Sequence, residues 1–155
     1  MYPIKIQDLS HARAAGILHR GPYAELGGPF QQLSGIIVSR GLFPHIRGMI
    51  AVYYDAPGSK PEAELKAHAA VITAESFPTD LAGLDYFDLA GGKYAILEHK
   101  GPPATLAGAY DWLYGKWLPQ SGEEPRDAPP IEWYLSDPRT TSPDETRTNI
   151  LLPLA

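Results

Sequence analysis

The sequence predicts an α+β domain built from two tandem copies of one β-α-β-β unit. Three observations support this prediction: the chain aligns with itself at one fixed shift, each half contains one helical pattern among extended runs, and the composition is globular. With one helix for every three strands, helices can cover only one face of a sheet. We expect a single domain over residues 1–155, with a first repeat of about 1–80 and a second of about 81–155.

The repeat is clearest at two Gly-Pro turns. His19–Pro22 (HRGP) falls on His99–Pro102 (HKGP) at a shift of 80 residues, and the same shift places Tyr54 on Tyr134. A register kept across turn, helix and strand positions indicates an internal repeat. We expect the two repeats to close on each other around a central ligand cleft, because the groove between paired repeats is a natural concave site.

Extended runs open and close each repeat. The opening runs, residues 13–20 and 93–100, each end at a Gly-Pro pair, which is typical of a turn. Two further extended runs are expected in each repeat, at residues 49–55, 68–73, 131–136 and 149–154.

One helix per repeat is predicted from apolar residues at a spacing of 3.6. The apolar stripe of the first repeat is Phe30, Leu33 and Ile37. The stripe of the second repeat is Leu106, Tyr110, Leu113 and Trp117. Pro119 cannot continue an α-helix, so we expect this second helix to end near Leu118.

The composition indicates a globular protein with an acidic surface. Hydrophobic residues make up 44% of the chain, and the formal net charge is −5. No basic stripe could neutralise a phosphate backbone, so direct nucleic-acid binding is not expected. The absence of cysteine excludes disulfides and thiolate metal sites, and the five histidines show no metal-ligand spacing. No membrane helix or secretory signal is evident, and we expect a cytoplasmic protein without a cofactor.

Glu132 is the strongest candidate for a functional side chain, because it breaks the repeat. At the shift of 80 its counterpart is Val52, so an acid replaces an apolar residue within a strand. Strand alternation predicts that Glu132 and Tyr134 face the groove, whereas Ile131 and Trp133 face the helix-packed core. A buried carboxylate is costly unless it is paired. The alternatives are an edge strand that leaves Glu132 in solvent, or a tyrosine hydroxyl that satisfies it.

The surrounding aromatic residues suggest a pocket with ring walls and one carboxylate at its floor. Such a site suits an apolar, flat and often cationic molecule, because rings stack on rings and attract positive charge. Each aromatic residue could equally be core or surface filler. The candidate wall residues are Tyr54, Tyr134, Tyr23, Tyr94 and Trp112.

Two runs of the second repeat resemble the GyrI-like family, which includes the effector-binding domains of AraC-type and BmrR-type regulators. They are Tyr114–Gly122 (YGKWLPQSG) and Ala128–Tyr134 (APPIEWY), and the earlier runs Met49–Asp55 and His19–Tyr23 fit the same family. The resemblance implies a duplicated fold of the SHS2 kind, a central ligand cleft and an acid at Glu132 that attracts cationic, lipophilic drugs. Without helix-turn-helix repeats, the chain is expected to be the standalone type.

The resemblance leaves three functions open. The first is binding of apolar or cationic aromatic small molecules, with Glu132 at the pocket floor. The second is hydrolysis of electrophilic toxins by a cyclopropanoid cyclopropyl hydrolase activity, with Glu132 as general acid or base and a tyrosine such as Tyr134 assisting. The third is a protein partner, as in a gyrase-protecting factor.

Overall fold

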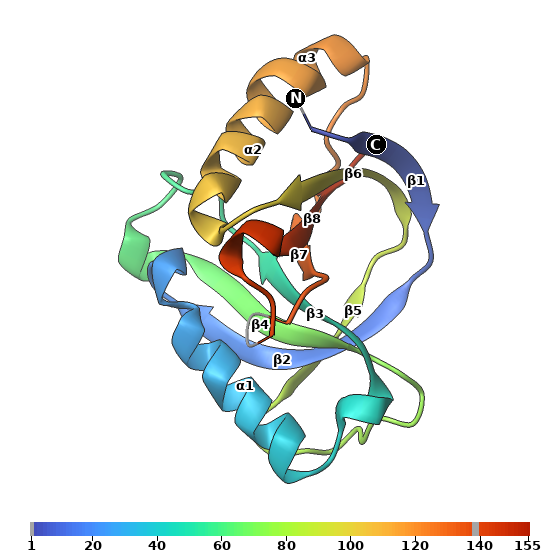
Figure 1. Ribbon diagram of the computed structural model, residues 1–155. Helices are drawn as coiled ribbons and strands as arrows, with labels where there is room; N and C mark the ends of the chain where they lie inside the picture. The colour runs from blue at the N-terminus through green and yellow to red at the C-terminus, as the bar shows by residue number, and fades with distance from the viewer. Residues whose placement is uncertain (1, 138–139) are drawn as a thin grey trace. The chain divides into compact units, whose positions relative to one another are not determined.

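A computed structural model describes residues 2–137 and 140–155, which fall into two compact units (Figure 1). Unit 1 consists of Met1–Leu9 and Gly92–Ala155, and unit 2 consists of Ser10–Gly91. Within the described residues each unit combines antiparallel strands with one main helical segment. The protein is therefore of the α+β class, as its sequence predicts.

Unit 1 contains four strands in the order β1-β6-β8-β7, and every neighbouring pair is antiparallel. The strands are β1 (Ile4–Leu9), β6 (Gly92–Lys100), β7 (Ile131–Tyr134) and β8 (Arg147–Pro153). The helical segments are η4 (Pro103–Thr105), α2 (Leu106–Trp112), η5 (Leu113–Trp117), α3 (Leu118–Ser121) and η6 (Pro143–Glu145).

Unit 2 has the same plan, with strands in the order β3-β4-β2-β5 and antiparallel pairing throughout. The strands are β2 (Ala12–Arg20), β3 (Ile46–Tyr53), β4 (Lys66–Thr73) and β5 (Asp85–Leu89). The helical segments are η1 (Tyr23–Glu25), α1 (Gly27–Ser39), η2 (Phe43–His45) and η3 (Glu62–Glu64).

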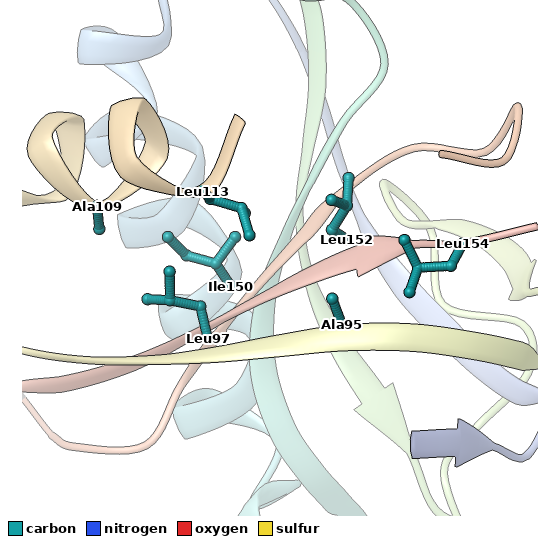
Figure 2. Packing of buried hydrophobic residues seen from close by; sticks show 7 residues of the cluster. All are labelled: Ala95, Leu97, Ala109, Leu113, Ile150, Leu152 and Leu154. Carbon is teal, nitrogen blue, oxygen red and sulfur yellow. The ribbon is translucent and has the colours of Figure 1, made fainter. Parts of the chain in front are cut away.

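The core of unit 1 lies between its helical segment and its sheet (Figure 2). Figure 2 shows Ala109 and Leu113 of the helical segment above Leu97 and Ile150 of the strands. Alternate residues of β6 and β8 enter this cluster, because successive side chains of a strand point to opposite faces. Each large aliphatic side chain buried here stabilises the fold by about 1.5–3 kcal/mol.

The core of unit 2 is built in the same way. Leu33 and Ile37 of α1 are fully buried against Ala15 of β2 and Val71 of β4. Small residues on the neighbouring strands let the backbones lie close together. At Gly16 a Cβ atom would lie 2.4 Å from the carbonyl oxygen of Ala69, so this position accepts only glycine without a shift of the strands.

The helical segment of unit 1 extends beyond the predicted end near Leu118. A π-helical turn, η5, leads into α3, so the segment ends at Ser121. Pro119 lies in the first turn of α3, where a missing backbone N–H costs little. Gly122, with φ of 75°, then closes the segment. Among residues 2–137 and 140–155, no helix is both long enough and apolar enough to cross a membrane.

The strand ladders correct the fixed shift of 80 residues. In unit 2, Ala15 of β2 pairs with Val71 of β4, and in unit 1 Ala95 of β6 pairs with Leu152 of β8. The first members of these pairs are 80 residues apart, whereas the second members are 81 apart. One additional residue therefore lies between β6 and β8, and the prediction of a single shift was wrong for the later strands.

The corrected register changes the counterpart of Glu132. Glu132 pairs with Ile150, and the pair at the corresponding place in unit 2 is Ala51 with Ala69. The counterpart is therefore Ala51 and not Val52. The acid still replaces a small apolar residue that is fully buried, so the chemical difference between the two positions persists.

Candidate functional site

Glu132 on β7 is buried, and tyrosine hydroxyls donate to both of its carboxylate oxygens. Tyr110 on α2 donates to Oε2 at 2.6 Å, and Tyr134 donates to Oε1 at 2.8 Å. Only 6% of Glu132 is exposed. These two donors replace hydrogen bonds to water that the carboxylate loses on burial, so the acid is accommodated inside the protein.

Glu132 faces the helical side of its sheet, which corrects the predicted orientation of β7. Directly paired residues on antiparallel strands share a face, and Ile150, the partner of Glu132, belongs to the core beneath α2. Glu132 and Tyr134 therefore lie on the helix-packed face, and Ile131 lies on the other face. The prediction was wrong because the hydroxyl of Tyr110 reaches the strand and allows an acid on the helix side.

Tyr114 extends the aromatic surface beside the cluster formed by Glu132, Tyr110 and Tyr134. Its ring lies parallel to that of Tyr110, with an interplanar angle of 9° and a centroid separation of 6.4 Å. Burial raises the pKa of Tyr114, although 43% of the residue is exposed. Because the ring is accessible and its hydroxyl is uncharged near neutral pH, a ligand could pack against it.

His99 contributes a neutral acceptor on the same face. It pairs with Thr148, which pairs in turn with Tyr134. Nε2 of His99 lies 2.8 Å from Oγ1 of Thr105, whose hydroxyl donates to a backbone carbonyl, so this hydroxyl accepts the Nε2 proton. Nδ1 is then a buried acceptor that receives no hydrogen bond from residues 2–137 or 140–155. Burial lowers the pKa of His99, and the negative charge of Glu132 opposes that effect.

A hollow with a volume of about 390 Å³ lies next to His99 in unit 1. Asn149 also lines it, and the Oδ1 atom of this residue is buried without a hydrogen-bond partner among the residues that the structure describes. The lining of the hollow combines charged side chains with apolar ones. Its lining residues are Tyr2, Pro3, Glu98, His99, Lys100, Leu135, Arg147 and Asn149.

The other predicted wall residues of unit 1 have structural contacts. Tyr94 is buried under the guanidinium of Arg126, which lies 5.2 Å from the ring centroid. Since Ala95 faces the core beneath α2, its neighbour Tyr94 lies on the opposite face from Glu132. Trp112 packs edge-on against Tyr2, with ring centroids 5.5 Å apart. Among the predicted aromatic residues of this unit, the structure brings Tyr134 to Glu132.

The two predicted wall residues of unit 2 are held by polar contacts. The hydroxyl of Tyr23 lies 2.6 Å from the carbonyl oxygen of Asp55 and 2.9 Å from that of Lys66, so it ties two backbone segments together. Tyr54 bonds to His68 instead, at 2.6 Å. Across the described residues, no group of three His, Asp or Glu side chains is arranged to hold a metal ion.

Sequence reasoning missed two residues of the site. Tyr110 is on the apolar stripe of the predicted helix, and nothing in the sequence indicates that its hydroxyl contacts Glu132. His99 is the repeat mate of His19 beside a Gly-Pro turn, and its position in the sequence does not indicate that it lies on the same face as Glu132. A useful signal was available in the acid itself, because a buried Glu132 requires donors from the elements packed on its face.

Comparison with known protein families shows to which family the chain belongs. A model of the GyrI-like small molecule binding domain matches residues 2–155. The chain belongs to the GyrI-like family. A relative named DNA gyrase inhibitor, from Edwardsiella piscicida, is 32% identical over 143 residues, covering 89% of this chain and 90% of its own.

Solved structures share the fold of this family member. One is the structure of SAV2435 bound to tetraphenylphosphonium, with a TM-score of 0.73 at 18% identity, covering 99% of this chain and 94% of that one. A hydrolase from Listeria innocua has a TM-score of 0.69 at 14% identity, covering 98% of this chain and 91% of that one. At such identities the similarity establishes the fold alone.

Proposed function

We propose that this protein binds apolar or cationic aromatic small molecules, with Glu132 as the charged group at the site. The observation that carries the proposal is the buried carboxylate, to which Tyr110 and Tyr134 both donate. Its membership of a small-molecule-binding family supports the proposal. So does the resemblance in fold to a protein solved with a lipophilic cation.

Electrostatics favour a cationic ligand at this site. A unit charge about 4 Å from a carboxylate near a protein surface is attracted by about 4 kcal/mol, before the cost of removing water from both groups. The rings of Tyr110 and Tyr114 add a cation–π contribution of about 0.5–2 kcal/mol. The net charge of −5 draws cations toward the whole chain.

The proposal includes a duplicated β-α-β-β architecture. The Gly-Pro turns make matching backbone hydrogen bonds in both units: Gly21 N to the Leu65 carbonyl and Gly101 N to the Thr146 carbonyl, both at 2.8 Å. The strand ladders also match once the extra residue is allowed for. In a duplicated scaffold, the positions that differ between units are the natural places for function, and Glu132 is one of them.

Isothermal titration with tetraphenylphosphonium tests the proposal. We expect Glu132→Gln to weaken binding by about tenfold or more, which corresponds to about 1.4 kcal/mol of lost attraction. Glu75→Gln is the matched control, because it removes the same charge from an exposed position in unit 2, away from Glu132 in unit 1. Equal losses in the two variants, or no loss in either, would contradict a specific role for Glu132.

Hydrolysis of an electrophilic substrate is a second candidate, which the fold resemblance to a hydrolase supports. Glu132 would activate water or protonate the leaving group, and the hydroxyl of Tyr134 would turn from Glu132 to hydrogen-bond to the developing oxyanion. Mass spectrometry with an electrophilic cyclopropane distinguishes the two functions. A binder holds the compound without changing it, whereas a hydrolase releases a ring-opened product that Glu132→Gln no longer forms.

Action on DNA gyrase is a third candidate, because a relative that is 32% identical carries the name DNA gyrase inhibitor. A supercoiling assay with added protein tests it directly. If gyrase activity falls to the same extent with wild type and Glu132→Gln, the effect belongs to a protein surface and not to the ligand site.

A further inference from the structure

Unit 2 contains a second cluster of reactive side chains, centred on His68 of β4. Nδ1 of His68 lies 2.6 Å from the hydroxyl of Tyr54, and Nε2 lies 2.8 Å from Oδ2 of Asp85. His68 is 9% exposed, whereas Tyr54 is 39% exposed. A buried imidazole thus connects a carboxylate to a hydroxyl at the surface.

Three strands position this cluster on one face of the sheet. His68 is paired with Leu18 of β2, and Asp85 of β5 is paired with Gly16 of the same strand. Residues two apart on a strand share a face, so the imidazole reaches the carboxylate across β2. Phe87 stacks on the imidazole, with centroids 4.5 Å apart and an angle of 26° between the rings. The ring is therefore fixed both by hydrogen bonds and by stacking.

The scaffold does not require this cluster. The backbone N–H of Tyr54 bonds to Lys66, and the backbone N–H of Leu135 bonds to Arg147 at the corresponding place in unit 1. Leu135 therefore corresponds to Tyr54. By the strand ladders, Asn149 corresponds to His68 and Lys5 corresponds to Asp85. A unit of the same plan thus folds without the carboxylate, the imidazole or the hydroxyl.

The hydrogen bonds define where the protons lie. A carboxylate only accepts, so Nε2 of His68 carries the proton that bonds to Asp85. In the neutral imidazole Nδ1 then carries no proton and accepts the proton of the Tyr54 hydroxyl. Burial, together with the charge of Asp85, raises the pKa of Tyr54 to about 12. The hydroxyl therefore keeps its proton until a neighbouring base removes it.

We propose that Tyr54 is a nucleophile that His68 activates as a base and Asp85 orients, and that it accepts acyl groups from small aryl esters. A hydroxyl, a base within hydrogen-bond reach and a third group that orients the base are the requirements of nucleophilic catalysis. The proposal is independent of Glu132, because all three residues belong to unit 2.

The reaction requires only the ester, water, Tyr54 and His68. The Tyr54 oxygen forms a bond to the carbonyl carbon of the ester while its proton passes to Nδ1 of His68. The bond between that carbon and the aryl oxygen then breaks, and the aryl oxygen takes the proton from Nδ1. Water next attacks the acyl-tyrosine with His68 as base, which releases a carboxylic acid and restores Tyr54.

The surroundings indicate the class of ester. The carboxylate of Asp85 is substantially exposed and repels anionic compounds, so neutral or cationic esters are favoured. Phe87 and the exposed side chain of Leu18 provide apolar surface beside the imidazole. An aromatic leaving group suits such a surface better than an alkyl chain bearing a charge.

Brief incubation with p-nitrophenyl acetate, followed by peptide mass spectrometry, tests the proposal. We expect acetyl to appear on Tyr54 about 100-fold faster than on Tyr114, a tyrosine of similar exposure, with a raised pKa and no histidine among its described contacts. This comparison needs no variant, so a folding defect cannot obscure it. Equal labelling of the two tyrosines would overturn the proposal.

Variants then assign the roles. His68→Gln and Asp85→Asn should each slow acetylation of Tyr54 by about tenfold or more, because each removes the base or its orienting partner. Tyr54→Phe should abolish the label. If acetylation of Tyr54 keeps its wild-type rate in a folded His68→Gln variant, the imidazole is not its base and the proposal fails.

Discussion

Tyr110 on α2 donates a hydrogen bond of 2.6 Å to Glu132 on β7, and this contact places the acid on the helix-packed face of its sheet. Hydroxyls that replace lost water stabilise this carboxylate, which is only 6% exposed. The same contact fixes the carboxylate in one orientation. A ligand that pairs with Glu132 therefore meets a positioned charge, which lowers the entropic cost of binding.

Replacement of Tyr110 by phenylalanine should destabilise the protein by about 1.5–3 kcal/mol, because a hydrogen bond to a charged group is lost inside the fold. Urea unfolding gives the free energy directly. Tyr114→Phe is the matched control, since Tyr114 belongs to the same helical segment and is 43% exposed, and it should cost little. If Tyr110→Phe is as stable as the control, the contact does not support Glu132.

The strands β2 and β6 could be predicted from the sequence. The expected runs 13–20 and 93–100 differ by only one residue from β2 and β6. The agreement is close because each run ends at a Gly-Pro pair, which fixes the end of the strand. The strands β1 and β5 were missed. Both are short and rich in polar residues, and their place is set by pairing with β6 and β2, which local sequence does not reveal.

The candidate site was only partly predictable. Glu132 stands out in the sequence because an acid is rare within an apolar strand, and Tyr134 follows from strand alternation. Tyr110 joins them because α2 packs on the sheet, and His99 lies on the same face because β6 and β7 both pair with β8. Both placements depend on contacts between distant parts of the chain. The orientation of Glu132 was mispredicted for the same reason, since alternation fixes which residues share a face but not which face is inside.

The stability contributed by His99 should depend on pH. Burial lowers the folded-state pKa of His99 below the ordinary value of 6.5, so the unfolded chain binds its proton more readily. This contribution is complete above that ordinary value and declines as the pH falls through it. We expect the difference in unfolding free energy between wild type and His99→Gln to shrink from about pH 7.5 to about pH 5.5. A difference that grows on acidification would contradict the lowered pKa.

Two glycine substitutions should have opposite effects. Gly16→Ala should destabilise the protein by about 1–3 kcal/mol, because its Cβ would lie 2.4 Å from the carbonyl oxygen of Ala69. Gly35→Ala should instead stabilise it by about 0.5–1 kcal/mol, since Gly35 lies within α1 and a Cβ there meets no atom within 4 Å. Thermal unfolding of both variants checks the pair, and similar melting temperatures would contradict the packing around Gly16.

The central claim is that Glu132 supplies a negative charge to a site for aromatic ligands, and paired titrations with tetraphenylphosphonium and tetraphenylborate test it most directly. The two ions have nearly the same shape and opposite charges, so their affinity ratio isolates electrostatics. We predict that wild type prefers the cation by about 100-fold, and that Glu132→Gln lowers this preference by about tenfold or more. Equal affinity for the two ions, or a preference unchanged in the variant, would contradict the claim.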